Sequence, residues 1–260
     1  MSKQLSGATA IITGASKGIG KAIALRLAQE GANVAICARD REALKQVAHE
    51  IESERGTAAA LPLDLRIAEN PAKLVAFAIE KFGEIHIVVN NAGATKRGEF
   101  ESLTEEDWAD GFALKFFGSV RLTRAAWPHL KATRGSAIFI SGVGGRTPGA
   151  EFAIGGSVNA ALLSLTKALA ETGLRDGIRV NTINPGTIRT ARFETRLAAF
   201  AAERNIAVSE AEREYVKQHK IARIGEPSDV AALVAFIASP EGSLLHGSLI
   251  DMDSGATKTV

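Results

Sequence analysis

A glycine-rich turn between an apolar strand and a helix constrains this chain more than any other feature. The run Thr13-Gly14-Ala15-Ser16-Lys17-Gly18-Ile19-Gly20 follows the apolar segment Thr9–Thr13 and opens an amphipathic pattern. Glycines let such a turn close tightly, so that backbone N–H groups at the helix start can approach the pyrophosphate of a dinucleotide. A glycine-rich run alone is weak support, but its place between strand and helix predicts a dinucleotide-binding α/β fold.

Short apolar runs alternate with longer amphipathic runs along the rest of the chain. This alternation predicts parallel strands joined by right-handed crossovers. We therefore expect one α/β domain over residues 1–260: a doubly wound, Rossmann-type parallel sheet of about seven strands with helices on both faces. The predicted strands are Thr9–Thr13, Asn33–Ala38, Ala58–Leu63, Ile85–Asn90, Ala137–Ser141, Arg179–Ile183 and Leu249–Met252. The predicted helices are Gly18–Glu30, Arg41–Glu54, Pro71–Phe82, Thr104–Lys131, Ser157–Thr172 and Pro227–Ser239.

One helical, charged segment, Ala191–Ala222, interrupts this order just after Pro185-Gly186. An insertion that leaves the carboxyl edge of the sheet before the last strand is well placed to cover a bound substrate. We predict a substrate lid over residues 190–222. The alternative is a surface excursion or an oligomer contact.

Composition narrows the class of partner. The net charge of the 260 residues is only +2 and no block of like charge stands out, which argues against nucleic acid or an anionic membrane as the main partner. The single cysteine, Cys37, excludes an intramolecular disulfide, and the five histidines lack metal-ligand spacing, so no metal site is expected. Because Met1–Ala10 lacks a charged stretch followed by an apolar signal core, we expect a cytoplasmic protein.

The end of the second strand indicates which dinucleotide binds. An acid that would bind the ribose 2′-OH is expected there, but the chain has Ala38 followed by Arg39. The planar fork of an arginine suits the 2′-phosphate of NADP, which Lys17 can also approach. Asp40 is better interpreted as a helix cap. We therefore predict NADP(H) as the cofactor, the alternative being two exposed basic residues without a ligand.

Several motifs occur together in one order: Thr13–Gly20, Asp64-Leu65, Asn90–Gly93 and Asn184–Thr190. In these the chain resembles the short-chain dehydrogenase/reductase family over Leu5–Gly255. The resemblance implies that Asp64 and Leu65 flank the adenine, and that the family forms homodimers or homotetramers through the helices Thr104–Lys131 and Ser157–Thr172. It further implies that Asn91, Ala92 and Gly93 pass beneath the adenine ribose, and that the nicotinamide carboxamide is held by Pro185, Gly186, Ile188 and Thr190.

The family's catalytic set is Asn, Ser, Tyr and Lys, and all four positions differ here by this resemblance. Aligning Ala160–Ala170 with the family's catalytic helix places Gly155 at the tyrosine and Asn159 at the lysine. Gly142 then stands at the serine position, and Lys115, seven residues after Trp108, at the asparagine position. Tyr215, the only tyrosine, lies in the predicted lid, where we interpret it as a packing residue.

Relative to the family, Lys115 stands at the asparagine position and Asn159 at the lysine position. By the resemblance these positions lie on two facing helices, so the two side chains look exchanged. We hypothesise that they still bind the nicotinamide ribose and relay protons, against the alternative of a lysine that reaches solvent from a drifted site. Three functions follow from these residues. The first is an NADP-dependent oxidoreductase acting on a small carbonyl or alcohol substrate with a non-standard proton donor. The others are an inactive NADP(H)-binding sensor or scaffold, and a non-redox lyase or isomerase.

Overall fold

The computed structural model describes residues 3–258 and contains one seven-stranded sheet. Met1 and Ser2 of the Met1–Ala10 segment, and the last two residues of the 1–260 range, lie outside this part. The strand order is β3-β2-β1-β4-β5-β6-β7, and every pairing between neighbours is parallel. The Rossmann-type α/β fold predicted from the alternation of strands and helices is confirmed.

The strands lie close to their predicted positions, with ends shifted by at most two residues. The strand order reverses between β1 and β4. The strands β2 and β3 therefore lie on one side of β1, and β4 to β7 lie on the other. The strands are β1 Thr9–Thr13, β2 Asn33–Ala38, β3 Thr57–Pro62, β4 Ile87–Asn90, β5 Ser136–Ile140, β6 Arg179–Pro185 and β7 Leu249–Met252.

Helices cover both faces of the sheet because the central strands are apolar on both sides. On β1, Ile12 packs into one core with α1, α2 and α9, while its neighbour Ile11 packs into the other with α3, α5 and α6. Successive side chains of a strand point to opposite faces, so the continuous run in β1 serves two cores at once. The helices are α1 Gly18–Gln29, α2 Arg41–Ser53, α3 Asn70–Phe82, α4 Glu105–Gly111, α5 Gly118–Thr133, α6 Ala153–Asp176, α7 Ala191–Arg204, α8 Val208–His219 and α9 Pro227–Ala238.

The predicted helix Thr104–Lys131 is divided in the structure. Between α4 and α5 the segment Phe112–Phe117 is a π-helix, so the α-helical hydrogen-bonding pattern is interrupted there. The Ser119 hydroxyl donates to the Lys115 carbonyl oxygen at 2.7 Å, at the junction of the π-helix with α5. Such π-segments occur often at functional sites, and this one carries Lys115.

Helix α6 begins four residues before its predicted start. Gly155 and Gly156 lower intrinsic helix propensity, yet both lie inside α6, which ends at Gly177 in the left-handed conformation. Residues Ala150–Asp176 are the one described segment long and apolar enough to cross a bilayer. Because α6 packs its buried face on β6 and the sheet, its apolar character fits a core helix of this fold.

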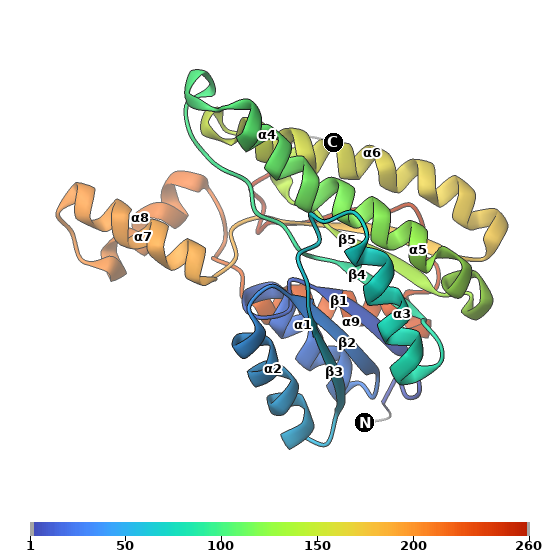
Figure 1. Ribbon diagram of the computed structural model, residues 1–260. Helices are drawn as coiled ribbons and strands as arrows, with labels where there is room; N and C mark the ends of the chain where they lie inside the picture. Colours follow the sequence, from blue (N-terminus) through green and yellow to red (C-terminus); the bar gives the residue numbers. More distant parts are fainter. Residues whose placement is uncertain (1–2, 259–260) are drawn as a thin grey trace.

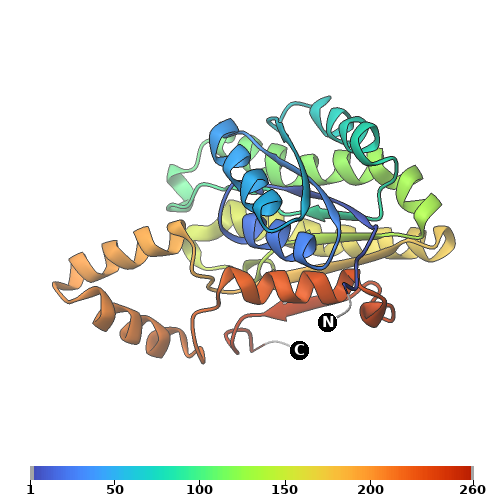
Figure 2. The ribbon, with the colours of Figure 1, turned by 90° about the horizontal axis from the view of Figure 1, so that it is seen from below.

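The segment predicted as a lid forms a helical hairpin, α7 and α8, between β6 and β7. Figure 1 shows the hairpin projecting from the body at the left, and Figure 2 shows it from below. The hairpin has a small apolar core of its own, formed by Phe193, Leu197, Ala201, Ala211, Tyr215, Ile221 and Ile224.

Candidate active site

The turn after β1 packs backbone against backbone at its glycines. A Cβ added to Gly20 would lie 2.3 Å from the Gly14 carbonyl oxygen, so no side chain fits there. Gly14 has φ +66°, a left-handed conformation that favours glycine. A Cβ at Gly18 would lie 3.3 Å from Thr190 Cγ2, so the start of the α7–α8 hairpin touches this turn.

The N-terminus of α1 is open to an anion. Its N-cap residue is Lys17, whose side chain makes no capping hydrogen bond, and the first turn carries no acidic residue. The free N–H groups and the helix dipole at such an end favour a phosphate group. Ser16 lies in the turn, and Ile19 is half-buried against the α1–α2–α9 core. These residues therefore fit the pyrophosphate of a dinucleotide.

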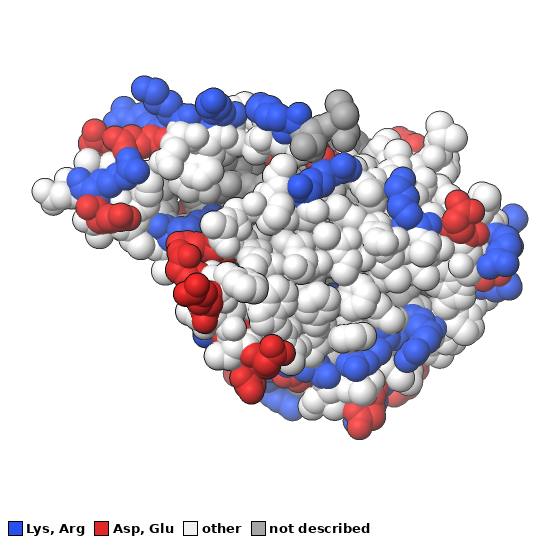
Figure 3. Space-filling view, turned by 90° about the horizontal axis from the view of Figure 1, so that it is seen from above, with Lys and Arg blue, Asp and Glu red and all other residues white. Residues whose placement is uncertain are grey.

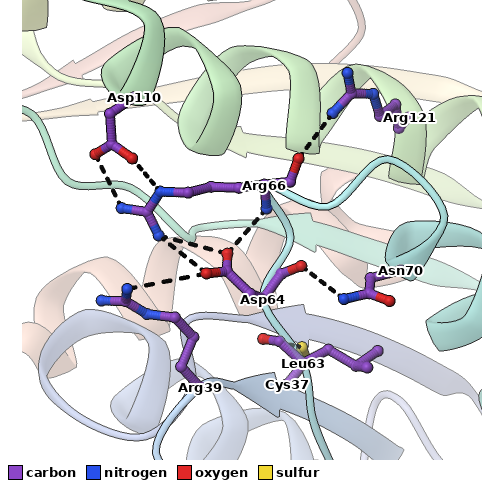
Figure 4. Close-up of polar contacts among 8 residues, drawn as sticks. All are labelled: Cys37, Arg39, Leu63, Asp64, Arg66, Asn70, Asp110 and Arg121. Carbon is purple, nitrogen blue, oxygen red and sulfur yellow. Dashed lines mark hydrogen bonds and ion pairs between the residues drawn. The ribbon is translucent and has the colours of Figure 1, made fainter. Parts of the chain in front are cut away.

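Figure 4 shows a group of charges after β2 and β3, where the adenosine end is expected. Arg66 holds Asp64 through its backbone N–H at 3.0 Å and also bonds Asp110. Arg39 is 64% exposed and reaches Asp64 only at 4.0 Å, so its guanidinium is free to turn toward a 2′-phosphate. Asp40 accepts a hydrogen bond from the backbone N–H of Ala43, which confirms its interpretation as a helix cap.

Leu65 and Cys37 are buried beside this group. Leu65 is 4% exposed and belongs to the core beneath α3 and α5. Cys37 is fully buried, and burial raises the pKa of its thiol to about 12, so the sulfur is inert at neutral pH.

Asn91 ties the end of β4 to the glycine-rich turn. Its side-chain amide donates to the Thr13 carbonyl oxygen at 2.8 Å. The Thr13 hydroxyl accepts from the backbone N–H groups of Asn91 and Ala92, both at 2.9 Å. The two loops are thus held together at the carboxyl edge of the sheet. Gly93 follows directly and leaves space that the side chain of Lys115 fills.

The loop after β6 connects this strand to α7 and packs on the chain after β7. A Cβ on Gly186 would lie 2.8 Å from Asp253 Cβ, so Pro185 and Gly186 pack closely on the chain after β7. Ile188 pairs with Gly225 in an isolated parallel bridge, and Thr190 is the N-cap residue of α7. Of these four residues, the structure places Thr190 against the glycine-rich turn.

Lys115 and Asn159 are in direct contact. The Lys115 Nζ donates to Asn159 Oδ1 at 2.6 Å and to the Ser141 carbonyl oxygen at 2.8 Å. Its aliphatic stem passes over Gly93, where an added Cβ would lie 2.8 Å from Lys115 Cδ. Burial, and secondarily the charge of Arg192, lower the pKa of Lys115 from 10.5 to about 8. An amine with a pKa so near neutrality can donate or accept a proton.

Gly142 lies beside this pair without a side chain to offer. An added Cβ would be 2.9 Å from Asn159 Nδ2. The neighbouring Ser141 turns its hydroxyl away and donates to the Asn159 carbonyl oxygen at 3.1 Å. Ser141 therefore anchors α6 to the end of β5.

The space beside Gly155 is filled by an aromatic ring. A Cβ at Gly155 would lie 2.1 Å from the ring atoms of Phe152, and one at Gly144 would lie 2.7 Å from the same ring. The guanidinium of Arg97 stacks on the ring at 4.1 Å from its centroid. The ring of Phe152 and the ammonium of Lys115 are thus the groups that line this part of the site.

Comparison with known proteins agrees with this architecture. The sequence model of a family described as enoyl-(acyl carrier protein) reductase matches residues 14–257. The chain belongs to the short-chain dehydrogenase/reductase family. It is 32% identical to the uncharacterised oxidoreductase YvaG of Bacillus subtilis, with all of both chains covered.

Two solved members of the short-chain dehydrogenase/reductase family are similar over nearly the whole chain. L-sorbose reductase from Gluconobacter frateurii, complexed with NADPH and L-sorbose, has a TM-score of 0.95 and 29% identity, with 100% of both chains covered. A short-chain dehydrogenase from Burkholderia cenocepacia in complex with NADP has a TM-score of 0.86 and 31% identity, covering 97% of this chain and 99% of the other. The family and the fold predicted from the sequence motifs are therefore confirmed.

Tyr215 of this short-chain dehydrogenase/reductase packs inside the α7–α8 hairpin. It is 8% exposed, stacks on His219 at 3.9 Å between ring centroids and meets Phe193 edge-on at 5.3 Å. Its hydroxyl lies 3.2 Å from the Thr187 hydroxyl, in the loop after β6. The contacts agree with its interpretation as a packing residue.

Sequence reasoning missed three arginines of this region. Arg97 lies in the loop after β4 and stacks on Phe152, Arg192 and Arg196 lie on α7, and no motif marks them. Arg146, in the loop after β5, bonds Asp251 on β7 at 3.1 Å. Within residues 3–258, no group of three His, Cys, Asp or Glu side chains is placed to hold a metal ion.

Proposed function

We propose that the protein is an NADP(H)-dependent oxidoreductase of a small carbonyl or alcohol substrate, in which Lys115 replaces the family's tyrosine as proton donor. The observation that carries this proposal is the contact of Lys115 Nζ with Asn159 Oδ1 at 2.6 Å, at the carboxyl edge of the sheet beside the glycine-rich turn. Oxidoreductase activity in general follows from the family, and a small-molecule substrate follows with it.

The cofactor prediction is confirmed by the NADPH and NADP complexes of the structural neighbours. In this chain the open N-terminus of α1 and the exposed Arg39 fit the pyrophosphate and the 2′-phosphate. When bound, NADPH supplies a hydride to the substrate carbon, and the protein has to supply the proton and the positioning.

Lys115 has the geometry of a positioned acid. Its ammonium group has three N–H bonds, of which two are engaged by Asn159 and the Ser141 carbonyl oxygen. The third can donate a proton to the carbonyl oxygen of a substrate as that oxygen gains negative charge, and solvent then reprotonates the amine. Asn159 is 3% exposed and holds the amine in place.

A catalytically inactive NADP(H)-binding protein is the second candidate, and one observation favours it. The Phe152 ring fills the space beside Gly155 and offers no group that transfers a proton. On this alternative the glycine-rich turn and Arg39 serve binding alone, and Lys115 only stabilises the contact between the loop after β5 and α6.

The test follows NADPH absorbance in the purified protein with fractionated host metabolites, beside a Lys115→Met variant. The proposal expects absorbance loss in the wild type alone, together with NADPH binding weakened in the variant well beyond the ~1 kcal/mol of one ordinary hydrogen bond. NADPH binding without turnover in any fraction would favour the inactive protein. Unchanged NADPH affinity in the variant would remove Lys115 from the site.

We also propose a homodimer or homotetramer in the cytoplasm. Less than half of the apolar stretch along α6 is buried within the chain. Phe117 on the neighbouring π-segment is 45% exposed and Leu174 on α6 is 73% exposed, which are apolar surfaces that a second copy can cover. Light scattering after size exclusion tests the assembly, and fractionation of host cells tests the location.

A further inference from the structure

The ring of Phe152 supports a cation, the guanidinium of Arg97, at the site. The guanidinium of Arg97 lies 4.1 Å from the ring centroid, and this ring in turn packs on Gly155 and Gly144. The loop that carries Arg97 is tied to the Phe152 turn, because the backbone N–H of Gly98 donates to the Glu151 carbonyl oxygen at 3.1 Å. The stacked guanidinium is thus held beside the position that Gly155 leaves without a side chain.

Two further arginines reach the same place from the lid. Arg192 and Arg196 stand one turn apart in α7, and Arg192 Nη2 donates to the Gly93 carbonyl oxygen at 3.0 Å. Gly93 is the residue on which the stem of Lys115 packs. Arg196 lies over the rings of Phe193 and Tyr215, at 5.5 and 6.0 Å from their centroids.

These cations are not neutralised by the protein. Among residues 3–258, Arg97, Arg192, Arg196 and Lys115 form no ion pair, whereas Arg189 and Arg204 of the same region bond Glu212 and Glu214. Burial, and then the charge of Arg196, lower the pKa of Arg97. Glu151 is the carboxylate whose charge acts on Arg97, without closing to an ion pair.

The recess between the hairpin and the body agrees with this arrangement. Figure 3 shows Lys and Arg side chains on the projecting hairpin and beside the recess, with Asp and Glu side chains also on the hairpin and on the adjacent edge of the body. Four positive groups that repel one another beside a site are stabilised when an anion enters among them.

We infer that Arg97, Arg192 and Arg196 bind the oxyanion group, a carboxylate or a phosphate ester, of an anionic carbonyl substrate. The inference rests on the proposed function, since it names the substrate class of the same site. The aromatic face of Phe152 and the stacked guanidinium of Arg97 form one wall, and the first turns of α7 bring the other two cations. A guanidinium fork matches a carboxylate or a phosphate in two parallel hydrogen bonds.

The experiment compares three ketoses that differ only at C1, using calorimetric titration of the protein saturated with NADP⁺. L-sorbose carries a hydroxymethyl group, 2-keto-L-gulonate a carboxylate, and L-sorbose 1-phosphate a phosphate ester at that carbon. Pyruvate and inorganic phosphate serve as fragments that carry an oxyanion without the sugar. Chloride is held constant throughout, and the carboxylate and phosphate arms show which oxyanion the site prefers.

We expect at least one oxyanion probe to bind roughly tenfold or more tightly than L-sorbose, as charge-assisted hydrogen bonds allow. The Arg97→Gln and Arg196→Gln variants should each lose most of this preference. Arg204→Gln is the matched control, because Arg204 also stacks on a phenylalanine in the hairpin, at 4.1 Å over Phe200, but is paired with Glu214. It should keep the preference in full.

Three outcomes would overturn the inference: no oxyanion probe binds more tightly than L-sorbose, the preference survives in the Arg97→Gln/Arg196→Gln double variant, or that variant loses NADP⁺ affinity to the same degree. The last would assign the arginines to the cofactor. Titration of NADP⁺ alone separates these failures from failure of the proposed function, because a protein that binds no NADP⁺ contradicts the function itself.

Discussion

The two halves of the carboxyl edge are built on different kinds of close contact. In the glycine-rich turn after β1, the space at Gly20 is closed by the Gly14 carbonyl oxygen, 2.3 Å from an added Cβ. Around α6, the space at Gly155 is closed by the ring of Phe152 at 2.1 Å. The Gly14 carbonyl oxygen cannot move without displacing the end of β1, whereas the Phe152 side chain can rotate. The first half is therefore fixed by the fold, and the second can be changed by one substitution.

The largest effect should come from Gly20→Ala. We expect roughly 2–4 kcal/mol of lost unfolding free energy and loss of NADP(H) binding, because the added methyl group meets backbone that cannot move away. Urea unfolding and NADPH fluorescence titration measure both. Adding Asn91→Ala should not restore stability, although Asn91 Nδ2 lies 2.5 Å from the same point, because the carbonyl oxygen remains.

A control glycine sharpens this result. Gly149→Ala places its Cβ in open space, with nothing within 4 Å, and should change the stability by less than ~0.5 kcal/mol. Rescue of Gly20→Ala by truncating Asn91 would show that the turn is limited by a side chain, and the contrast between the two halves would be lost.

Gly155→Ala should have a smaller effect that can be rescued. Overpacking against the Phe152 ring is expected to cost about 1–3 kcal/mol of unfolding free energy. In the Gly155→Ala/Phe152→Ala double variant the clash is absent, so a double-mutant cycle should give a favourable coupling of about 1 kcal/mol or more. Additive effects of the two substitutions would mean that the ring does not limit the space at residue 155.

The pH dependence of stability reports on Lys115. Its pKa is lowered from 10.5 to about 8 in the folded protein, so the unfolded chain binds more protons between these values. The contribution of Lys115 to stability is therefore least below pH 8 and rises as the pH approaches 10.5, by at most about 1.4 kcal/mol per pH unit. Comparing wild type with Lys115→Met in urea at pH 7, 8, 9 and 10 isolates this group. A difference that stays constant across the series would contradict the lowered pKa.

The smallest effect is expected at the base of the lid. Arg189 bonds Glu226 at 2.9 Å, Glu194 at 3.0 Å and Glu212 at 2.6 Å. Because Arg189 is 32% exposed, Arg189→Met should cost only about 1 kcal/mol of global stability, but it should speed proteolysis within residues 190–222. Limited trypsin digestion followed by mass spectrometry measures this. Arg223→Met, which removes an outer pair with Asp229, is the control and should leave the digestion rate of the hairpin unchanged.

The sequence predicts the fold and the glycine-rich turn between β1 and α1 well, for a physical reason. Strands, helices and the turn Thr13–Gly20 are defined by neighbours along the chain, so periodicity and local spacing identify them. The contact of Lys115 with Asn159 was suggested by the family's positions and agrees with the structure, while their roles in ribose binding and proton transfer remain predictions.

The part of the site around α6 depends on contacts between distant segments. Phe152 and Arg97 meet because two loops are joined by the Gly98–Glu151 hydrogen bond, and nothing local to either residue shows it. The π-segment Phe112–Phe117 could not be predicted from the sequence because its residues fit an ordinary α-helical pattern. The start of α6 was predicted four residues too late because Gly155 and Gly156 have low helix propensity. Tertiary packing, not propensity, makes the first turn of α6 helical.

The separate core of the α7–α8 hairpin has a consequence for how such a protein diversifies. Phe193, Leu197 and Tyr215 pack mainly on one another, so the hairpin needs little from the sheet to keep its shape. An element of this kind can be grafted as a unit between related proteins or replaced by one of another length, while the sheet and its glycine-rich turn stay as they are. Sequence change can then accumulate in one segment of about thirty residues without endangering the folding of the remainder.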